Sequence, residues 1–221
     1  MPGLIKNAVK SFKISFLVNY LNQLKLEAVM IFKHPHEYGL MALVSREDYI
    51  LLDKYRKKLD PLVKFYMRPD FFEGVAPQHI SLCYFSYPDK YPEEFVEKLA
   101  PKINKIAAKF LPLKVKVQGL KGGWELGLGV PAIVWNIIDL KKISQFRAEL
   151  VAELKKDIAH FNDPEVDFTP HIGIALGKEE ETAKLKEIVE KSRNDKPVEL
   201  TINEIFIFYP KGPKRIFEKR I

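Results

Sequence analysis

Hydrophobic and polar positions follow two periods along this chain, and the period changes from segment to segment. Apolar residues at every second position, or in short runs, predict strands at 38–45, 80–85, 113–120, 132–138, 172–176 and 198–208. Apolar residues at every third or fourth position predict helices at 46–60, 92–110, 141–161 and 178–192. A segment rich in Pro and Phe, 61–78, is predicted as a loop. The pattern as a whole predicts an α+β protein.

Two signals predict where helices of the first half begin or bend. Ser45, followed by Asp48 three residues on, predicts a capping box where the helix 46–60 begins. Pro101 is expected to kink or restart the helix 92–110, because proline removes a helical hydrogen bond.

The first 36 residues form a separate segment, predicted as an amphipathic helix and a linker. Residues 4–26 place apolar side chains at helical spacing and carry four lysines before the first acid, Glu27. We expect this helix to pack its apolar side on the rest of the protein. A helix on a membrane surface and an organelle transit peptide are alternatives, although the absence of Arg and the scarcity of Ser disfavour the second.

The remaining residues, 37–221, contain a duplicated order of elements. Strand, helix, loop, histidine strand, helix and strand occur once in 37–120 and again in 130–209. His79 follows Ala42 by 37 positions, and His171 follows Val134 by the same 37 positions. We expect one bilobal domain with interleaved lobes: two pseudo-symmetric small antiparallel sheets with outer helices, and a central cleft where the histidines meet.

Alternation along the two histidine strands predicts which side chains share a face. In the first strand the expected site face carries His79, Ser81 and Cys83, and the opposite face carries Ile80, Leu82 and Tyr84. In the second strand the expected site face carries His171, Gly173 and Ala175. Two imidazoles can serve as base and acid near neutral pH, and a hydroxyl such as that of Ser81 can donate to a phosphate oxygen.

At these residues the sequence resembles the 2H phosphoesterase superfamily, which includes LigT-like RNA 2′,3′-cyclic phosphodiesterases. The superfamily signature is two His-x-Thr/Ser-x motifs, matched by "HISL" from His79 and, except at Gly173, by "HIGI" from His171. The segments "VQGLKGGW" and "IFIFYPKGPKRIF" also resemble family features, and the likeness covers residues 37–221. The resemblance implies that the two histidines are the acid/base pair and that Ser81 binds phosphate.

Gly173 departs from this signature, because it offers no hydroxyl to the phosphate. Losing one such donor typically lowers the rate by about 10²–10³-fold. The hydroxyl of Thr169, a water molecule or the Gly173 amide is expected to occupy the phosphate-binding position instead.

Other residues are candidates for contacts with a nucleobase or a phosphate. The candidates are Tyr66, Arg68, Phe72, Trp124, Lys211, Lys214 and Arg215. Aromatic rings can stack on bases and basic side chains can meet phosphates. Core aromatics and solvated basic residues remain an equally good interpretation of each one.

Composition limits the classes of protein that this chain can represent. The formal net charge of +7 favours an anionic partner, and the single cysteine, Cys83, excludes an internal disulfide and is typical of a reducing compartment. No Cys, His or carboxylate spacing forms a zinc site, and no Gly-rich nucleotide-binding motif occurs. We expect a cytoplasmic protein without metal or other cofactor and see no obligatory protein partner.

The sequence therefore predicts a metal-independent phosphodiesterase that acts on RNA ends or small oligonucleotides, on a 2′,3′-cyclic phosphate or a 2′,5′-linkage. A catalytically weakened module that binds RNA or a nucleotide in the same cleft is the alternative. A membrane-associated scaffold, led by residues 4–26, is a more distant alternative.

Overall fold

The computed structural model describes residues 37–68, 77–86, 92–158, 161, 169–209 and 212–219. The predicted N-terminal helix lies outside these residues, so the division of the chain at residue 36 stays a prediction. Phe72 and Lys211 also lie outside them. No helix in the described ranges is long and apolar enough to cross a membrane.

Eight strands and four α-helices make up the described fold. The strands are β1 (Glu37–Val44), β2 (Val63–Tyr66), β3 (His79–Ser86), β4 (Leu113–Gly122), β5 (Ala132–Ile137), β6 (Ile172–Gly177), β7 (Val198–Tyr209) and β8 (Gly212–Glu218). The α-helices are α2 (Asp53–Leu59), α3 (Pro92–Phe110), α4 (Lys141–Leu154) and α5 (Thr182–Ser192). Three short 3₁₀ helices accompany them: η1 (Arg46–Leu52), η2 (Gly123–Glu125) and η3 (Glu179–Glu181).

The six predicted strands and the α+β class are confirmed, but β2 and β8 were not predicted. β2 has four residues inside the segment expected to be a loop, too few for alternation to show. The predicted capping box is also absent. The Ser45 hydroxyl donates to the Glu47 carboxylate and accepts no hydrogen bond from a helix backbone N–H, and the Asp48 carboxylate accepts from the backbone N–H of Thr201. The segment that they introduce accordingly begins as a 3₁₀ helix.

The strands pair only in the antiparallel sense within the described residues, and they form two four-stranded sheets. One sheet has the order β3-β1-β7-β8, and the other has the order β2-β6-β5-β4. Two joints connect them: β3 meets β6 at Ile80 and Ile172, and residues 113–117 of β4 pair with residues 198–202 of β7. We call the sheet with β3 the first lobe and the sheet with β6 the second lobe.

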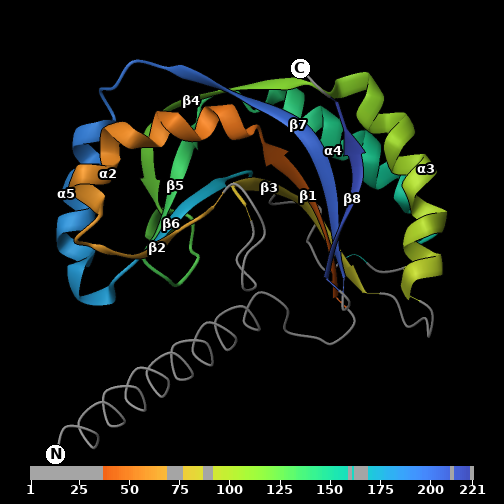
Figure 1. Cartoon of the computed structure of the whole chain (residues 1–221), viewed down its shortest axis with the longest axis horizontal. Helices are drawn as coiled ribbons and strands as arrows, with labels where there is room; N and C mark the ends of the chain where they lie inside the picture. Colours follow the sequence, from red (N-terminus) through yellow and green to blue (C-terminus); the bar gives the residue numbers. More distant parts are fainter. Residues whose placement is uncertain are drawn as a thin grey trace, which may run out of the picture.

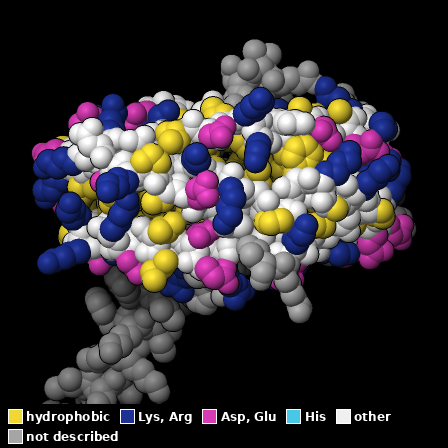
Figure 2. Space-filling view, turned by 90° about the horizontal axis from the view of Figure 1, so that it is seen from above, with side chains coloured by type: hydrophobic (Ala, Val, Ile, Leu, Met, Phe, Trp, Pro, Cys, Tyr) yellow, Lys and Arg dark blue, Asp and Glu magenta, His cyan; other side chains and the backbone are white. Residues whose placement is uncertain are grey.

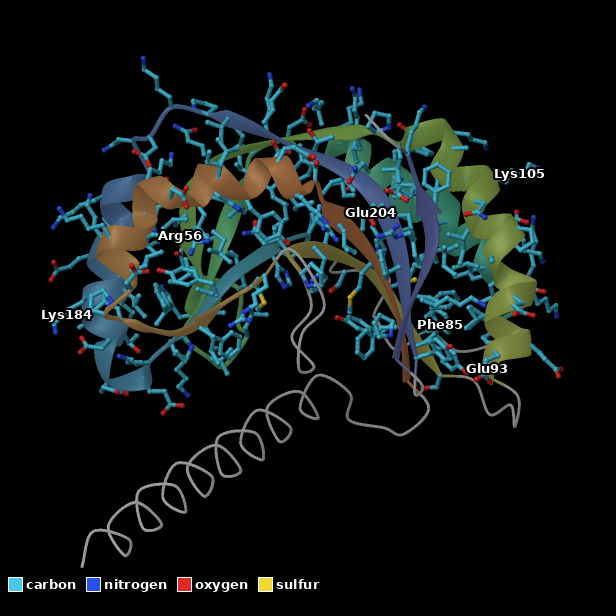
Figure 3. The ribbon with its side chains drawn as sticks, viewed as in Figure 1. Arg56, Phe85, Glu93, Lys105, Lys184 and Glu204 are labelled. Carbon is cyan, nitrogen blue, oxygen red and sulfur yellow. The ribbon has the colours of Figure 1, made fainter. Side chains whose placement is uncertain are left out.

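Helices cover the outer side of the arched sheet at both ends (Figure 1). α2 and α5 lie at the end formed by the second lobe, and α3 and α4 lie at the end formed by the first. Each helix packs an apolar side into one continuous core; Phe85 of β3, for example, meets Phe95 of α3 with ring centroids 6.3 Å apart (Figure 3). The other face of the central strands, free of these helices, is where the histidines lie.

Basic side chains are distributed among acidic ones on the surface seen in Figure 2. Lysine and arginine side chains are interspersed there with aspartate and glutamate. Ion pairs such as that of Lys109 with Glu149, at 3.3 Å, occur among the described residues. The positive net charge therefore does not gather into one patch on this face.

Candidate active site

The two motif histidines have the same local geometry. His79 Nδ1 lies 2.7 Å from the carbonyl oxygen of Pro77, and His171 Nδ1 lies 3.1 Å from the carbonyl oxygen of Thr169. A carbonyl can only accept, so each Nδ1 carries a hydrogen and donates it. In the neutral ring the lone pair is then on Nε2, which has no hydrogen-bond partner among the described residues. Both rings thus present Nε2 for proton transfer.

The joint between β3 and β6 brings the two histidines together. Ile80 is the cross-strand partner of Ile172, and both side chains are fully buried in the core. Their neighbours point to the other face, so antiparallel register sets Ser81 beside His171 and His79 beside Gly173. The histidines are then diagonal neighbours, which are typically about 7–8 Å apart, with a somewhat shorter distance between their Cβ atoms. A phosphate group fits between side chains at that separation.

His79 and His171 are also coupled electrostatically. Burial lowers the pKa of His79 below its ordinary value; the Pro77 carbonyl acts in the opposite direction, and the charge of His171 adds to the lowering. A charged His171 thus disfavours protonation of His79. The lowered pKa keeps His79 neutral, and hence able to accept a proton, to a lower pH than an ordinary histidine.

A β-bulge in β3 changes the alternation expected from the sequence. Met41 pairs with Ser81 and Leu40 pairs with Cys83, so Leu82 is an extra residue in β3. After the bulge the two faces exchange. Cys83, expected on the site face, is fully buried in the core, whereas Tyr84, expected in the core, lies on the site face. The predicted orientations of both residues were wrong.

Tyr84, which the bulge turns to the site face, is a site residue that the sequence pattern missed. The Tyr84 hydroxyl lies 2.8 Å from the Ser81 hydroxyl, in hydrogen-bond contact. Its ring lies over Gly39 of β1, where an added Cβ would approach Tyr84 Cε1 to 3.0 Å. A glycine within the apolar run of the first strand was the available signal, because glycine inside a strand often marks a close approach.

The second histidine strand has a bulge at the equivalent position. Val134 pairs with Gly173 and Ile133 pairs with Ala175, so Ile174 is the extra residue in β6. Gly173 therefore corresponds to Ser81, and Leu176 corresponds to Tyr84. The site face of the second lobe has no hydroxyl at either position.

Apolar side chains extend the site face in both lobes. A Cβ added at Gly173 would lie 3.5 Å from Cε of Met67, an ordinary van der Waals contact. In the first lobe, Met41 and Phe206 form a second, smaller hydrophobic cluster with Leu43. The cross-strand pairs of Leu43 with His79 and of Met41 with Ser81 place this cluster beside the motif.

Arg215 and Glu204 border that apolar cluster. The Arg215 guanidinium lies 5.4 Å from the Phe206 ring centroid and 3.0 Å from a Glu204 carboxylate oxygen. Figure 3 labels Glu204 on β7, near the middle of the molecule. Of the basic residues after the last predicted strand, Arg215 is therefore on the face of the histidines.

The geometry separates several sequence candidates from the histidines. Tyr66 faces α2, because its hydroxyl bonds Asp60 at 2.8 Å and its ring lies under Arg56; its neighbour Met67 takes the site face. Lys214 lies on the helix side of β8, 3.4 Å from Glu97 of α3.

The structure gives contacts of three further candidates, Trp124, Arg68 and Thr169. Trp124 of η2 lies under Lys186 of α5, beyond the end of β6 that is farther from His171. The Arg68 carbonyl oxygen accepts from the Tyr49 hydroxyl at 3.0 Å, while its side chain is exposed. Thr169 uses its carbonyl oxygen to hold His171.

A family model for the 2′-5′ RNA ligase superfamily matches residues 54–213, the segment that contains both histidine motifs. The chain belongs to this superfamily, the 2H phosphoesterases. A search of curated protein sequences returned no match.

A solved structure of LigT of E. coli, complexed with 3′-AMP, shares the fold. It is 13% identical over 85% of this chain and 98% of its own, with a TM-score of 0.50. Two further matches have lower TM-scores. Usb1 of Kluyveromyces marxianus, with uridine monophosphate, is 11% identical over 83% of this chain and 98% of its own, with a TM-score of 0.49. TT0787 of Thermus thermophilus is 13% identical over 81% of this chain and 93% of its own, with a TM-score of 0.47.

Membership in the 2H phosphoesterases establishes a general class of activity. The superfamily consists of phosphodiesterases that act in RNA processing, and this chain has both histidines of the two-motif signature. Among the described residues, no group of three or more His, Cys, Asp and Glu side chains is placed to hold a metal ion. The reaction itself depends on how the site face uses its few polar groups.

Proposed function

We propose that this 2H phosphoesterase is a metal-independent phosphodiesterase that hydrolyses a 2′,3′-cyclic phosphate or a 2′,5′-linkage at RNA ends or in small oligonucleotides. The observation that carries the proposal is the matched pair of histidines. Both rings donate Nδ1–H to a carbonyl two residues earlier and leave Nε2 available, on adjacent strands. The LigT structure that shares the fold holds 3′-AMP, which agrees with a nucleotide substrate.

The lowered pKa of His79 supports this residue as the base in the proposed hydrolysis. Neutral His79 accepts a proton at Nε2 from the attacking water, and the water oxygen forms a bond to phosphorus. The bond between phosphorus and the ribose leaving oxygen breaks, and protonated His171 gives its Nε2 proton to that oxygen. The product is a phosphate monoester, and the two histidines exchange protons with solvent before the next cycle.

Charge that develops on the phosphate during this reaction needs a hydrogen-bond donor. Ser81 lies beside His171 in the register of β3 and β6 and two residues from His79 along β3, so its hydroxyl can donate to a non-bridging oxygen. Basic side chains contribute less here, because Lys214 is paired on the other side of β8 and Arg215 is paired with Glu204. A cytoplasmic location and independence from cofactors belong to the same proposal.

A binding module that does not turn over its ligand is the second candidate function. The observation that favours it is the second lobe, where Gly173 and Leu176 present no hydroxyl to a phosphate. Such a site would still hold an RNA end through Ser81 and the apolar residues around it.

Turnover by the purified full-length protein, in the presence of EDTA, distinguishes the two. We expect release of a monophosphate from 2′,3′-cyclic nucleotides or from 2′,5′-linked dinucleotides, with 3′,5′-linked dinucleotides as the comparison. His79→Asn and His171→Asn should each lower kcat by about 10²–10⁴-fold, the usual contribution of a general acid or base. Tight binding without turnover of any linkage would favour the binding module, and loss of activity in EDTA with rescue by a metal would contradict the two-histidine mechanism.

A further inference from the structure

The site face has an unequal distribution of hydroxyls between its two lobes. The bulges in β3 and β6 make Gly173 equivalent to Ser81 and Leu176 equivalent to Tyr84. Two hydroxyls in contact at 2.8 Å therefore occupy the first lobe, and the same two positions of the second lobe have none. At these positions, hydroxyl donors for a phosphate are therefore present only in the first lobe.

Two features hold Tyr84 in contact with Ser81. The extra residue Leu82 turns Tyr84 to the site face, and its carbonyl oxygen accepts a hydrogen bond from Arg147 Nε of α4 at 2.7 Å. In β6 the equivalent carbonyl, that of Ile174, is bonded by the backbone N–H of Met67, directly after β2. The side chain of Arg147 thus satisfies the bulge carbonyl of the first lobe, as a backbone N–H satisfies the equivalent carbonyl of the second lobe.

The direction of the hydroxyl–hydroxyl bond decides what Ser81 can do. A serine hydroxyl has one hydrogen, and Tyr84 is the hydrogen-bond partner of Ser81 within the described residues. If Ser81 donated to Tyr84, that hydrogen would be used inside the protein. A phenol, with an ordinary pKa of about 10, is a better donor than an aliphatic hydroxyl, so Tyr84 is the favoured donor. A hydroxyl that accepts a hydrogen bond also becomes a stronger donor.

We propose that Tyr84 is a positioning residue of the phosphate site, which donates to Ser81 Oγ and thereby directs the single Ser81 hydrogen to a non-bridging phosphate oxygen. This inference rests on the proposed function, because it needs a phosphate at Ser81. It explains how the chain retains an aligned donor, the Ser81 hydroxyl, although the second motif has Gly173 where the signature has Thr or Ser.

A double-mutant cycle tests this role, with 2′,3′-cyclic nucleotide turnover as one readout and the dissociation constant for 3′-AMP as the other. Tyr84→Phe keeps the ring over Gly39 and removes only the hydroxyl. We expect it to lower kcat by about tenfold, the scale of one intramolecular hydrogen bond, with a small change in KM. Ser81→Ala should lower kcat by about 10²-fold. The double variant should be no slower than Ser81→Ala, because Tyr84 acts through Ser81.

Tyr55→Phe is the matched control, since it removes a tyrosine hydroxyl that contacts Asp195, away from the site face. It should leave kcat unchanged, and circular dichroism should show all variants folded. Independent, multiplicative losses in the double variant, or a Tyr84→Phe enzyme as fast as wild type, would overturn the inference while the proposed hydrolysis stands. Non-additive losses in 3′-AMP affinity, in a protein that turns over no linkage, would support the inference and overturn the proposed hydrolysis.

Discussion

Ile80 of β3 and Ile172 of β6 lie directly opposite each other, and both side chains are completely buried. This pair joins the two lobes at the position where the two histidine motifs begin. Because side chains alternate across a strand, two isoleucines fixed in the core oblige His79 and His171 to share the other face. The chemistry of the site follows from that diagonal proximity, as does the first prediction.

The neighbouring charge of His171 should be measurable in the titration of His79. In wild-type protein the His79 ring should titrate below the ordinary value of about 6.5, since burial and His171 both lower its pKa. Because the neutral form is the base, the acid limb of kcat/KM should also fall below about pH 6.5. His171→Asn removes one cause of the lowering, so the His79 midpoint should rise while burial keeps it below the ordinary value. Imidazole NMR signals followed against pH measure the His79 midpoint in wild-type protein and in His171→Asn. A lower His79 midpoint in His171→Asn would contradict the coupling.

Thr169 should matter through its backbone and not through its hydroxyl. Its carbonyl oxygen accepts the Nδ1–H of His171, and a Thr169→Val variant keeps that carbonyl. We therefore expect kcat and KM of Thr169→Val to lie within about twofold of wild type, as is usual for a surface substitution. A loss of tenfold or more in kcat would instead show that the threonine hydroxyl replaces the donor missing at Gly173.

A hydroxyl restored at position 173 should accelerate the reaction. Among the described residues, a Cβ at Gly173 would come closest to Met67, at 3.5 Å, so a small side chain fits against them without displacing the backbone. Gly173→Ser would add a donor beside His171, and kcat should rise, by at most the 10²–10³-fold or so that one such donor supplies. Gly173→Ala is the control and should leave kcat nearly unchanged. Weaker substrate binding in both variants would show that the substrate approaches the bare Gly173 backbone.

At Gly39, on the same face, an added side chain would be crowded, in contrast to Gly173. A Cβ there would come within 3.0 Å of the Tyr84 ring and 3.4 Å of Met41 Cε, closer than side chains normally pack. Gly39→Ala should therefore displace Tyr84 and lower kcat, by a factor similar to that of Tyr84→Phe. Comparison with Gly173→Ala separates this local clash from the general effect of placing alanine in a strand. An active Gly39→Ala enzyme with wild-type kcat would contradict the tight packing of Tyr84 on β1.

Arg147 should contribute to activity from outside the site. Arg147→Met keeps the aliphatic stem but leaves the Leu82 carbonyl without its Nε–H donor. The free energy of unfolding should fall by about 1–3 kcal/mol, the cost of an unsatisfied buried polar group, and kcat should fall because the bulge holds Tyr84 and Ser81. Urea denaturation and steady-state kinetics measure the two effects. A stability loss with unchanged kcat would show that the bulge forms without Arg147.

The sequence alone predicted the class of fold and the superfamily of this protein. Strand periodicity and helix periodicity are local properties, and the α+β class that they predicted is confirmed. The resemblance of the His79 and His171 motifs indicated the superfamily, which the family model confirms. The two matching histidine motifs also predicted which strands meet, because a duplicated unit places equivalent residues near its symmetry axis.

Only the tertiary structure decided which neighbours complete the site. Alternation assigned Cys83 to the site and Tyr84 to the core, and the bulge at Leu82 reversed both. A bulge leaves one residue unpaired in the ladder, so its position depends on groups that satisfy that residue from elsewhere. Here the group is the guanidinium of Arg147, 65 positions later in the chain. Alternation of side chains along a strand carries no information about such a distant donor. Which residues of β3 point to the site face was therefore decided only when α4 packed on the sheet.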